Sequence, residues 1–256
     1  MTEWRQATAR WRVTPKVICI GGMRCGTTTF FRMIRQHPDF VRAEKKEIHY
    51  FDRTEDPTDL GYRASFPTSL ALRLRSPRAF TADVTPKYLV NPNVAERIRK
   101  VLGPDVRMLV LLRNPVARAI SHYYKRIRVG LDTLSIEESF AAALANRNPN
   151  PTDYLPRGHF AEQISLYIDT FSREQLLIRF SADFFSDAQR TLDEVADHFG
   201  IARWTPQPGT RSKAHKYEAP SPALVEKLEA YFEPHDAALS ELLGTELPWR
   251  RSQGPE

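Results

Sequence analysis

The chain has 256 residues, of which 41% are hydrophobic and 27% charged, and its formal net charge is +6. This composition is ordinary for a folded globular protein, and it excludes a fibrous or low-complexity chain. The positive charge fits an anionic partner, such as a nucleotide, a phosphorylated or sulfated substrate, or nucleic acid, but charge alone does not choose between them.

The cysteines and the amino-terminal segment indicate a reducing setting. Only Cys19 and Cys25 are present, and two thiols cannot make a disulfide framework or a four-thiolate zinc site. The first residues are polar and basic with no apolar core, so no secretory signal is predicted. Apolar runs such as 108–112 are too short to cross a bilayer. We therefore expect a cytoplasmic protein with no membrane span.

The first elements along the chain are a strand, a glycine loop and a helix. Residues 17–20 form an apolar run that meets Gly21-Gly22, which predicts a buried strand entering a tight turn. Residues 27–36 then carry apolar side chains at helical spacing, and His37-Pro38 ends that helix. The order predicts a strand–loop–helix unit.

A second alternation of strand and helix follows. Residues 80–84 predict a strand, and Asn91-Pro92 predicts the N-cap and first turn of a helix that runs to about residue 102. Residues 107–112 are apolar at every position after the first, which is typical of a strand buried on both faces of a parallel sheet. Asn114-Pro115 begins a helix that continues towards Gly130.

The remaining elements continue the alternation. They are, in order, a helix at 136–145 with a Ser135/Glu138 capping box, a loop at 146–156, a helix at 160–171, a strand at 175–180, a helix at 186–199 closed by Gly200, a loop at 204–219, and a helical region at 222–243 broken near Pro234. Strands that alternate with helices predict an α/β fold with a central parallel sheet flanked by helices in three layers.

The segment from Gly21 to Thr29 carries a phosphate-loop signal. Its first eight residues, GGMRCGTT, nearly match the P-loop pattern GxxxxGK[ST]. A glycine loop between a strand and a helix directs backbone N–H groups and the helix dipole at an anion. Thr27, Thr28 and Thr29 add hydroxyl donors. A plain strand-to-helix turn also uses glycine, but three threonines and a cation in the loop favour an anion site.

The departures from a P-loop are informative. Thr27 stands where a kinase has its lysine, the loop cation is Arg24, and the strand at 107–112 ends in Arg113 instead of a metal-binding acid. This arrangement fits a nucleotide with a 5′-phosphate-type group and a second, separate phosphate better than it fits ATP. A P-loop nucleotide kinase or phosphotransferase and a non-catalytic nucleotide-binding module remain alternatives.

The loop Arg24-Cys25-Gly26-Thr27-Thr28 resembles the KxGTT loop of the sulfotransferases that use 3′-phosphoadenosine 5′-phosphosulfate (PAPS). The resemblance is strongest to the branch of heparan sulfate sulfotransferases and their bacterial relatives, with arginine in place of lysine. The family's second signature is an arginine at a strand end and a serine eight residues later, which hold the 3′-phosphate. Arg113 and Ser121 fit it.

Three further segments resemble the same family. Residues 45–52 resemble the segment with the catalytic glutamate, which falls on Glu47, and His49 is the alternative base or an acceptor contact. Residues 83–88 resemble a pattern written EKTPxYF, whose lysine falls on Val84, so Lys87 is a candidate replacement. Residues 211–217 resemble a late basic loop, and its implied cofactor contacts are Lys213, Ala214, His215 and Lys216.

One domain over residues 1–256 is predicted, because the strand at 175–180 fits the same sheet. The resemblance covers about 16–249 and implies a sulfotransferase with a P-loop-type fold. It implies transfer of a sulfuryl group from PAPS to a hydroxyl or amine of a carbohydrate or small-metabolite acceptor, with release of 3′-phosphoadenosine 5′-phosphate (PAP). The implied catalytic residues are Glu47, Arg24 and His49, and no metal is expected. No nucleic-acid partner is expected, because no nucleic-acid-binding motif is present. The sequence predicts neither the acceptor's identity nor the oligomeric state.

Overall fold

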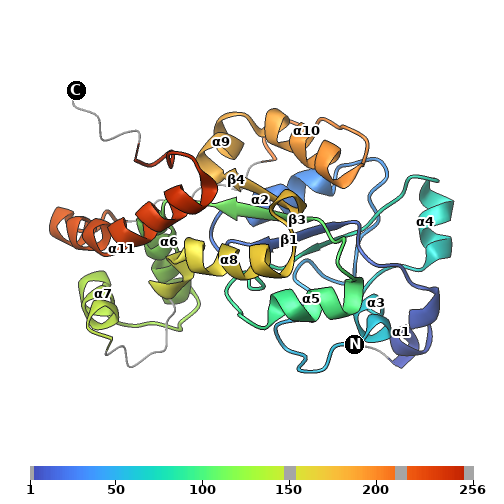
Figure 1. Cartoon of the computed structure of the whole chain (residues 1–256), viewed down its shortest axis with the longest axis horizontal. Helices are drawn as coiled ribbons and strands as arrows, with labels where there is room; N and C mark the ends of the chain where they lie inside the picture. The colour runs from blue at the N-terminus through green and yellow to red at the C-terminus, as the bar shows by residue number, and fades with distance from the viewer. Residues whose placement is uncertain (1–2, 147–153, 211–217, 251–256) are drawn as a thin grey trace. The chain divides into compact units, whose positions relative to one another are not determined.

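The computed structural model describes residues 3–146, 154–210 and 218–250 (Figure 1). The chain divides into two compact units. The first unit contains Met1–Leu112 and Leu166–Ser212, and the second contains Arg113–Ser165 and Lys213–Glu256. The single domain expected from the sequence stays a prediction.

The first unit is built on a parallel sheet in the order β2-β1-β3-β4. Its strands are β1 (Val17–Gly21), β2 (Ala82–Val84), β3 (Met108–Leu112) and β4 (Leu176–Phe180). Every residue of β1 and β3 is buried, which explains why their sequences are continuously apolar. The predicted parallel sheet, and all four of its predicted strands, are confirmed.

Helices cover both faces of this sheet. Figure 1 shows α2 (Thr27–Ile34) and α10 (Ala188–Phe199) on one side of the strands and α5 (Val94–Leu102) on the other. The remaining helices of the unit are α1 (Glu3–Ala7), η1 (Ala9–Trp11), α3 (Asp59–Arg63), α4 (Ser69–Arg75), η3 (Arg173–Gln175) and α9 (Ser181–Ser186). The predicted three-layer α/β architecture is confirmed.

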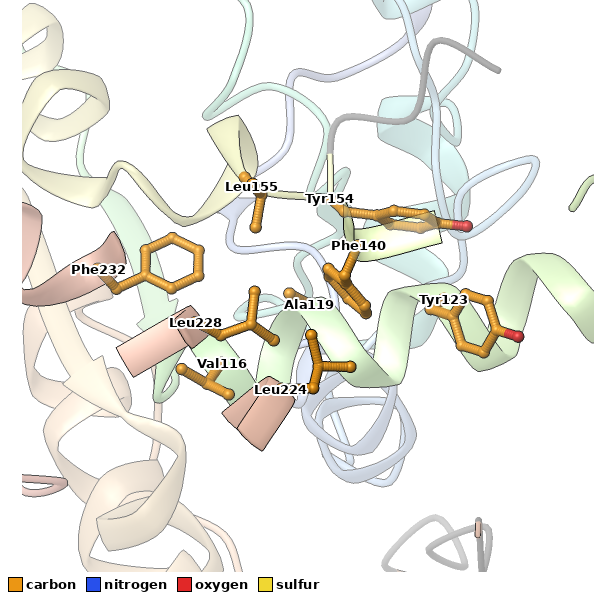
Figure 2. Close-up of a cluster of buried hydrophobic side chains, with 9 residues drawn as sticks. All are labelled: Val116, Ala119, Tyr123, Phe140, Tyr154, Leu155, Leu224, Leu228 and Phe232. Carbon is orange, nitrogen blue, oxygen red and sulfur yellow. The ribbon is translucent and has the colours of Figure 1, made fainter. Parts of the chain in front are cut away.

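The second unit is helical and has its own hydrophobic core. It contains α6 (Pro115–Arg128), α7 (Ile136–Leu144), η2 (Pro156–Gly158), the first half of α8 (Phe160–Thr170) and α11 (Pro222–Leu243). Figure 2 shows the cluster at its centre, in which Leu224, Leu228 and Phe232 of α11 lie against α6. The other members are Val116, Ala119, Tyr123, Phe140, Tyr154 and Leu155.

The predicted helix ends are confirmed where a side chain or a glycine caps them. The Asn114 side chain accepts a hydrogen bond from the Ala117 N–H at 3.0 Å, so α6 begins at Pro115 as expected. The Ser135/Glu138 capping box is present at α7. Gly200 ends α10 in the left-handed conformation, with φ of 58°.

Two predicted helix starts are wrong. Asn91 does not cap α5: its side chain accepts a hydrogen bond from the Asn93 N–H at 3.1 Å, which makes a turn, and the helix begins at Val94. The helix expected from residue 186 begins at Ala188 as α10, because the Asp187 side chain caps it through the Arg190 N–H at 3.0 Å. The short helix α9, which ends at Ser186, was not predicted.

The break expected near Pro234 is also wrong, because α11 runs continuously through it. A proline inside a helix removes a hydrogen bond and costs about 3 kcal/mol. Phe232, Asp236 and Leu239 are buried on either side of Pro234, so packing of this helix outweighs the local cost.

The loop predicted at 204–219 is confirmed over its described residues, 204–210 and 218–219. Most of the loop predicted at 146–156 lies outside the described residues. Across the three described ranges, no helix combines the length and apolar character that crossing a membrane requires.

Candidate functional site

The loop between β1 and α2 has the backbone of an anion-binding turn. Arg24 has φ of 69° and Gly26 has φ of 96°, so two positions of this short loop are left-handed. Gly26 is the N-cap of α2, and the N–H groups of that helix's first turn point towards the loop. Loops that mix right- and left-handed residues form concave nests of N–H donors for anions.

Hydrogen bonds fix this loop at the carboxyl edge of the sheet. The Gly22 N–H donates to the Leu111 carbonyl at 2.6 Å, which joins the loop to β3. The Ser181 hydroxyl, directly after β4, donates to the Cys25 carbonyl at 2.6 Å. The carboxyl ends of parallel strands are where open α/β sheets bind ligands. Cys25 is buried.

The three threonines after the loop have different environments. Thr27 and Thr29 are buried, whereas the side chain of Thr28 is exposed. The Lys46 Nζ donates to the Thr28 hydroxyl at 3.2 Å and to Glu47 Oε1 at 2.7 Å. Lys46 therefore joins the amino-terminal end of α2 to the carboxylate of Glu47.

Glu47 continues into a carboxylate–histidine–carboxylate chain. Its Oε2 lies 3.3 Å from His49 Nε2, and the His49 Nδ1 lies 3.1 Å from Asp52 Oδ2. The Asp52 side chain is fully buried, and the Lys87 Nζ lies 3.5 Å from the same Oδ2. A buried carboxylate on one ring nitrogen orients the imidazole. The Asp52 carboxylate thus holds the Nε2 of His49 towards Glu47.

The backbone at His49 is unusual, and its neighbours hold it in place. His49 has φ of 56°, a conformation that is uncommon for residues other than glycine. On one side of it the Ile48 N–H donates to Thr85 Oγ1 at 2.9 Å, and on the other the Tyr50 N–H donates to the Tyr88 hydroxyl at 3.1 Å. Outliers of this kind gather at functional sites, where the surroundings over-determine them.

The side chain of Asp83 in β2 holds both Thr85 and Tyr88 in place. Its carboxylate accepts hydrogen bonds from Thr85 at 2.6 Å, from Tyr88 at 3.0 Å and from Tyr62 at 2.9 Å. Burial raises the pKa of Asp83 to about 6, and these three hydroxyl groups lower it by a smaller amount. Asp83 therefore positions the His49 segment from inside the core.

Asp83→Asn is expected to destabilise the protein by about 1–3 kcal/mol at low pH, because the amide nitrogen cannot accept a hydrogen bond, whereas both oxygens of the protonated carboxyl group can. Between about pH 4 and pH 6 the unfolded chain loses the Asp83 proton before the folded chain does, since the folded pKa is the higher one. The wild-type free energy of unfolding therefore gradually loses up to about 3 kcal/mol as the pH rises through this window.

The variant lacks this contribution. The amount by which its free energy of unfolding falls below that of the wild type should therefore decrease from about pH 4 to pH 6. Urea unfolding of both proteins across that range measures the difference. A deficit that stays constant with pH would contradict the role given to the Asp83 carboxyl group.

The structure brings together part of the predicted set of site residues. Arg24 through Thr29, Glu47 and His49 all belong to the first unit. Arg113 directly follows β3 as the first residue of the second unit, and Ser121 is a buried residue of α6. Lys213, Ala214, His215 and Lys216 lie outside the described residues. Val84, at the family's lysine position, is buried at the end of β2.

Two partners of the predicted residues were not assigned from the sequence. The link from Lys46 to Thr28 joins segments 18 positions apart, which no local pattern predicts. Asp52 belongs to the segment noted at 45–52. Its position three residues after His49 was the sequence feature that could have predicted the contact between them. Glu47 also forms an ion pair with Lys46. A surface glutamate with no catalytic role would make the same ion pair.

A parallel α/β sheet with a glycine loop opening a helix at its carboxyl edge is typical of proteins that bind the phosphate groups of nucleotides. The family described as "Sulfotransferase domain" matches residues 14–213, so the chain belongs to the sulfotransferase family. Family membership confirms the resemblance drawn from the sequence, identifies sulfuryl transfer as the reaction and does not favour a nucleotide kinase.

Individual relatives agree with this assignment. The mouse heparan sulfate glucosamine 3-O-sulfotransferase 6 is 25% identical over 92% of this chain and 73% of its own length. The human heparan sulfate glucosamine 3-O-sulfotransferase 3B1 is 30% identical over 74% of this chain and 47% of its own length. A crystal structure of a sulfotransferase from Alicyclobacillus acidocaldarius superposes with a TM-score of 0.72 at 29% identity, over 93% of this chain and 99% of that one.

Proposed function

We propose that the protein transfers the sulfuryl group of PAPS to a hydroxyl or amine of a carbohydrate acceptor and releases PAP. The observation that carries the proposal is the position of Lys46, which contacts both Thr28 at the start of α2 and the carboxylate of Glu47. A base and an anion-binding helix end are thereby neighbours, as in-line attack on a bound sulfuryl group requires.

The loop is proposed to bind the phosphosulfate end of the donor. Arg24, Cys25, Gly26 and Thr27–Thr29 supply a cation, backbone N–H groups and hydroxyl groups at the amino-terminal end of α2. In transfer the sulfur–oxygen bond to the phosphate breaks, and negative charge grows on the bridging oxygen. Arg24 and the helix end stabilise this charge, so the step needs no metal ion.

Glu47 is proposed as the general base. It takes the acceptor's proton as the acceptor oxygen or nitrogen bonds to sulfur, and the pair of electrons from the broken bond leaves on PAP. Its carboxylate is 39% exposed, so an acceptor can reach it. His49 is the alternative base. Its contact with the buried Asp52 supports a positioning role for His49 beside Glu47.

The 3′-phosphate of the donor is assigned to Arg113 and Ser121 through the family signature. Lys213, Ala214, His215 and Lys216 are assigned as further cofactor contacts on the same ground. Among possible acceptors, a carbohydrate is preferred because the curated relatives are named as glucosamine sulfotransferases of heparan sulfate.

The single domain over residues 1–256 is part of the same proposal, as is a cytoplasmic location.

Thermal unfolding of the purified protein tests the donor. PAP at about 100 times its Kd should raise the unfolding free energy by about 2.7 kcal/mol, which is a clear rise in the midpoint temperature. ATP with Mg²⁺ should shift the midpoint little. A larger shift with Mg-ATP than with PAP would overturn the proposal and favour a kinase.

Arg113→Ala tests the 3′-phosphate assignment in the same assay. The variant should lose most of the shift with PAP and keep the shift with adenosine 5′-phosphosulfate, which has no 3′-phosphate. A charge-assisted hydrogen bond contributes about 1.5–3 kcal/mol, so the expected loss in PAP affinity is roughly 10–150-fold. If Arg113→Ala weakens the binding of both ligands equally, Arg113 does not bind the 3′-phosphate.

A further inference from the structure

A second group of chemically active side chains lies in the second unit and includes none of the residues assigned to sulfuryl transfer. His159 directly precedes α8, Glu162 is in the first turn of that helix, and His235 lies on α11 beside Pro234. One potential ligand atom from each residue lies within 4.8 Å of the other two. Two imidazoles and a carboxylate from two separate segments of the second unit therefore lie close together.

The spacing of these atoms approaches that around a metal ion. Glu162 Oε1 lies 3.4 Å from His235 Nδ1, and its Oε2 lies 3.7 Å from His159 Nδ1. A tetrahedral zinc ion, with bonds of about 2.0–2.2 Å, holds its ligand atoms roughly 3.3–3.5 Å apart. Each histidine thus lies at nearly this spacing from one oxygen of Glu162, His235 from Oε1 and His159 from Oε2.

The two histidine rings are stacked, with centroids 3.7 Å apart and planes 10° from parallel. To bind one ion, the rings must open from this stack so that their lone pairs converge. The Glu162 side chain is 67% exposed and that of His235 is 25% exposed, so the cluster has an open side for this movement and for entry of an ion.

Tyr231 supplies the outer partner that histidine ligands usually have. Its hydroxyl oxygen lies 2.9 Å from His159 Nε2. A hydrogen on Nε2 that is donated to this oxygen leaves the lone pair of Nδ1 facing Glu162, which is the tautomer that a ligand at Nδ1 requires. Oxygen partners of this kind orient metal-binding histidines, and losing one lowers metal affinity by about 10–100-fold.

We propose that His159, Glu162 and His235 bind one divalent transition-metal ion of the zinc class. Two imidazoles and one carboxylate are a ligand set that zinc takes in proteins, with water at the remaining position. The ion joins the start of α8 to α11, so its role is to stabilise the second unit. It takes no part in the proposed sulfuryl transfer, for which no metal is invoked.

Calorimetric titration tests the site on the full-length, tag-free protein after treatment with a chelator. Zn²⁺ should bind with one ion per chain and raise the thermal midpoint. His159→Gln and His235→Gln should each weaken binding more than about tenfold. His198→Gln, which removes a half-buried histidine of α10, is the matched control and should bind Zn²⁺ as the wild type does.

Two further measurements separate this site from adventitious binding. Tyr231→Phe should lower the Zn²⁺ affinity by about 10–100-fold while the stoichiometry stays at one. Co²⁺ bound to the wild type should give the visible absorption of a low-symmetry site, and His235→Gln should abolish it. The proposal is overturned if Zn²⁺ does not bind stoichiometrically, or if His159→Gln, His235→Gln and His198→Gln bind it equally.

Discussion

Glu47→Gln is expected to lower the turnover of sulfuryl transfer by about 10²–10⁴-fold, because the amide cannot accept the acceptor's proton. Glutamine has the same shape and can keep the contact with Lys46 through its carbonyl oxygen, so the loop and α2 should stay in place. The affinity for PAP should therefore remain close to that of the wild type. Initial rates with saturating PAPS, together with calorimetric titration of PAP, measure the two quantities.

Glu55→Gln is the matched control, because it removes one exposed carboxylate from the segment after Asp52. It should leave turnover unchanged. His49→Gln distinguishes the base from its neighbour. If His49 only positions Glu47, this variant should lose less activity than Glu47→Gln. If Glu47→Gln keeps its turnover and His49→Gln loses most of it, then His49 is the general base and Glu47 is not.

Arg24→Gly is expected to lower turnover by about 10²–10³-fold with little change in stability. The arginine holds φ of 69°, a left-handed conformation that costs other residues about 1–2 kcal/mol and costs glycine nothing. Glycine's greater freedom in the unfolded chain offsets this gain, so the free energy of unfolding should stay within about 1 kcal/mol of the wild type. The lost activity would then report on the guanidinium group alone.

Arg24→Lys is the matched variant, because it keeps the charge and loses the bidentate fork. It should recover a large part of the activity that glycine removes, as expected if the cation stabilises charge on the bridging oxygen. Steady-state kinetics and urea unfolding on the three proteins check both parts. Wild-type turnover in a stable Arg24→Gly protein would show that this side chain has no part in transfer.

Local signals in the sequence were sufficient for the sheet and for the loop. The strands β1 and β3 were predicted because burial on both faces leaves a continuous apolar run, as in Met108–Leu112. The glycine loop was predicted because left-handed positions and a helix start require particular residues at fixed spacing, and Gly26 has the left-handed φ that this reasoning expects.

Features set by tertiary contacts were not predictable in this way. The continuity of α11 through Pro234 depends on buried side chains that pack in the second unit. The helices α1, α3, α4 and α9 have five to seven residues, which is too short to show a helical period.

The support beneath the candidate base also depends on the fold. Thr85 and Tyr88 hold the backbone on either side of His49, but they are more than 35 positions away from it in the chain. The sequence placed residues 83–88 in a family segment without showing what they contact. Only the parallel pairing of β1 with β2, which ends at Val84, brings this segment to the carboxyl edge of the sheet.

Transfer of labelled sulfuryl from PAPS to a heparan-type oligosaccharide tests the central claim most directly. The wild type should form a sulfated oligosaccharide and PAP in equal amounts without an added metal ion, and Glu47→Gln should form neither at a comparable rate. If the wild type binds PAP but forms no sulfated product with hydroxyl- or amine-bearing carbohydrates, the proposed carbohydrate sulfotransferase activity is contradicted.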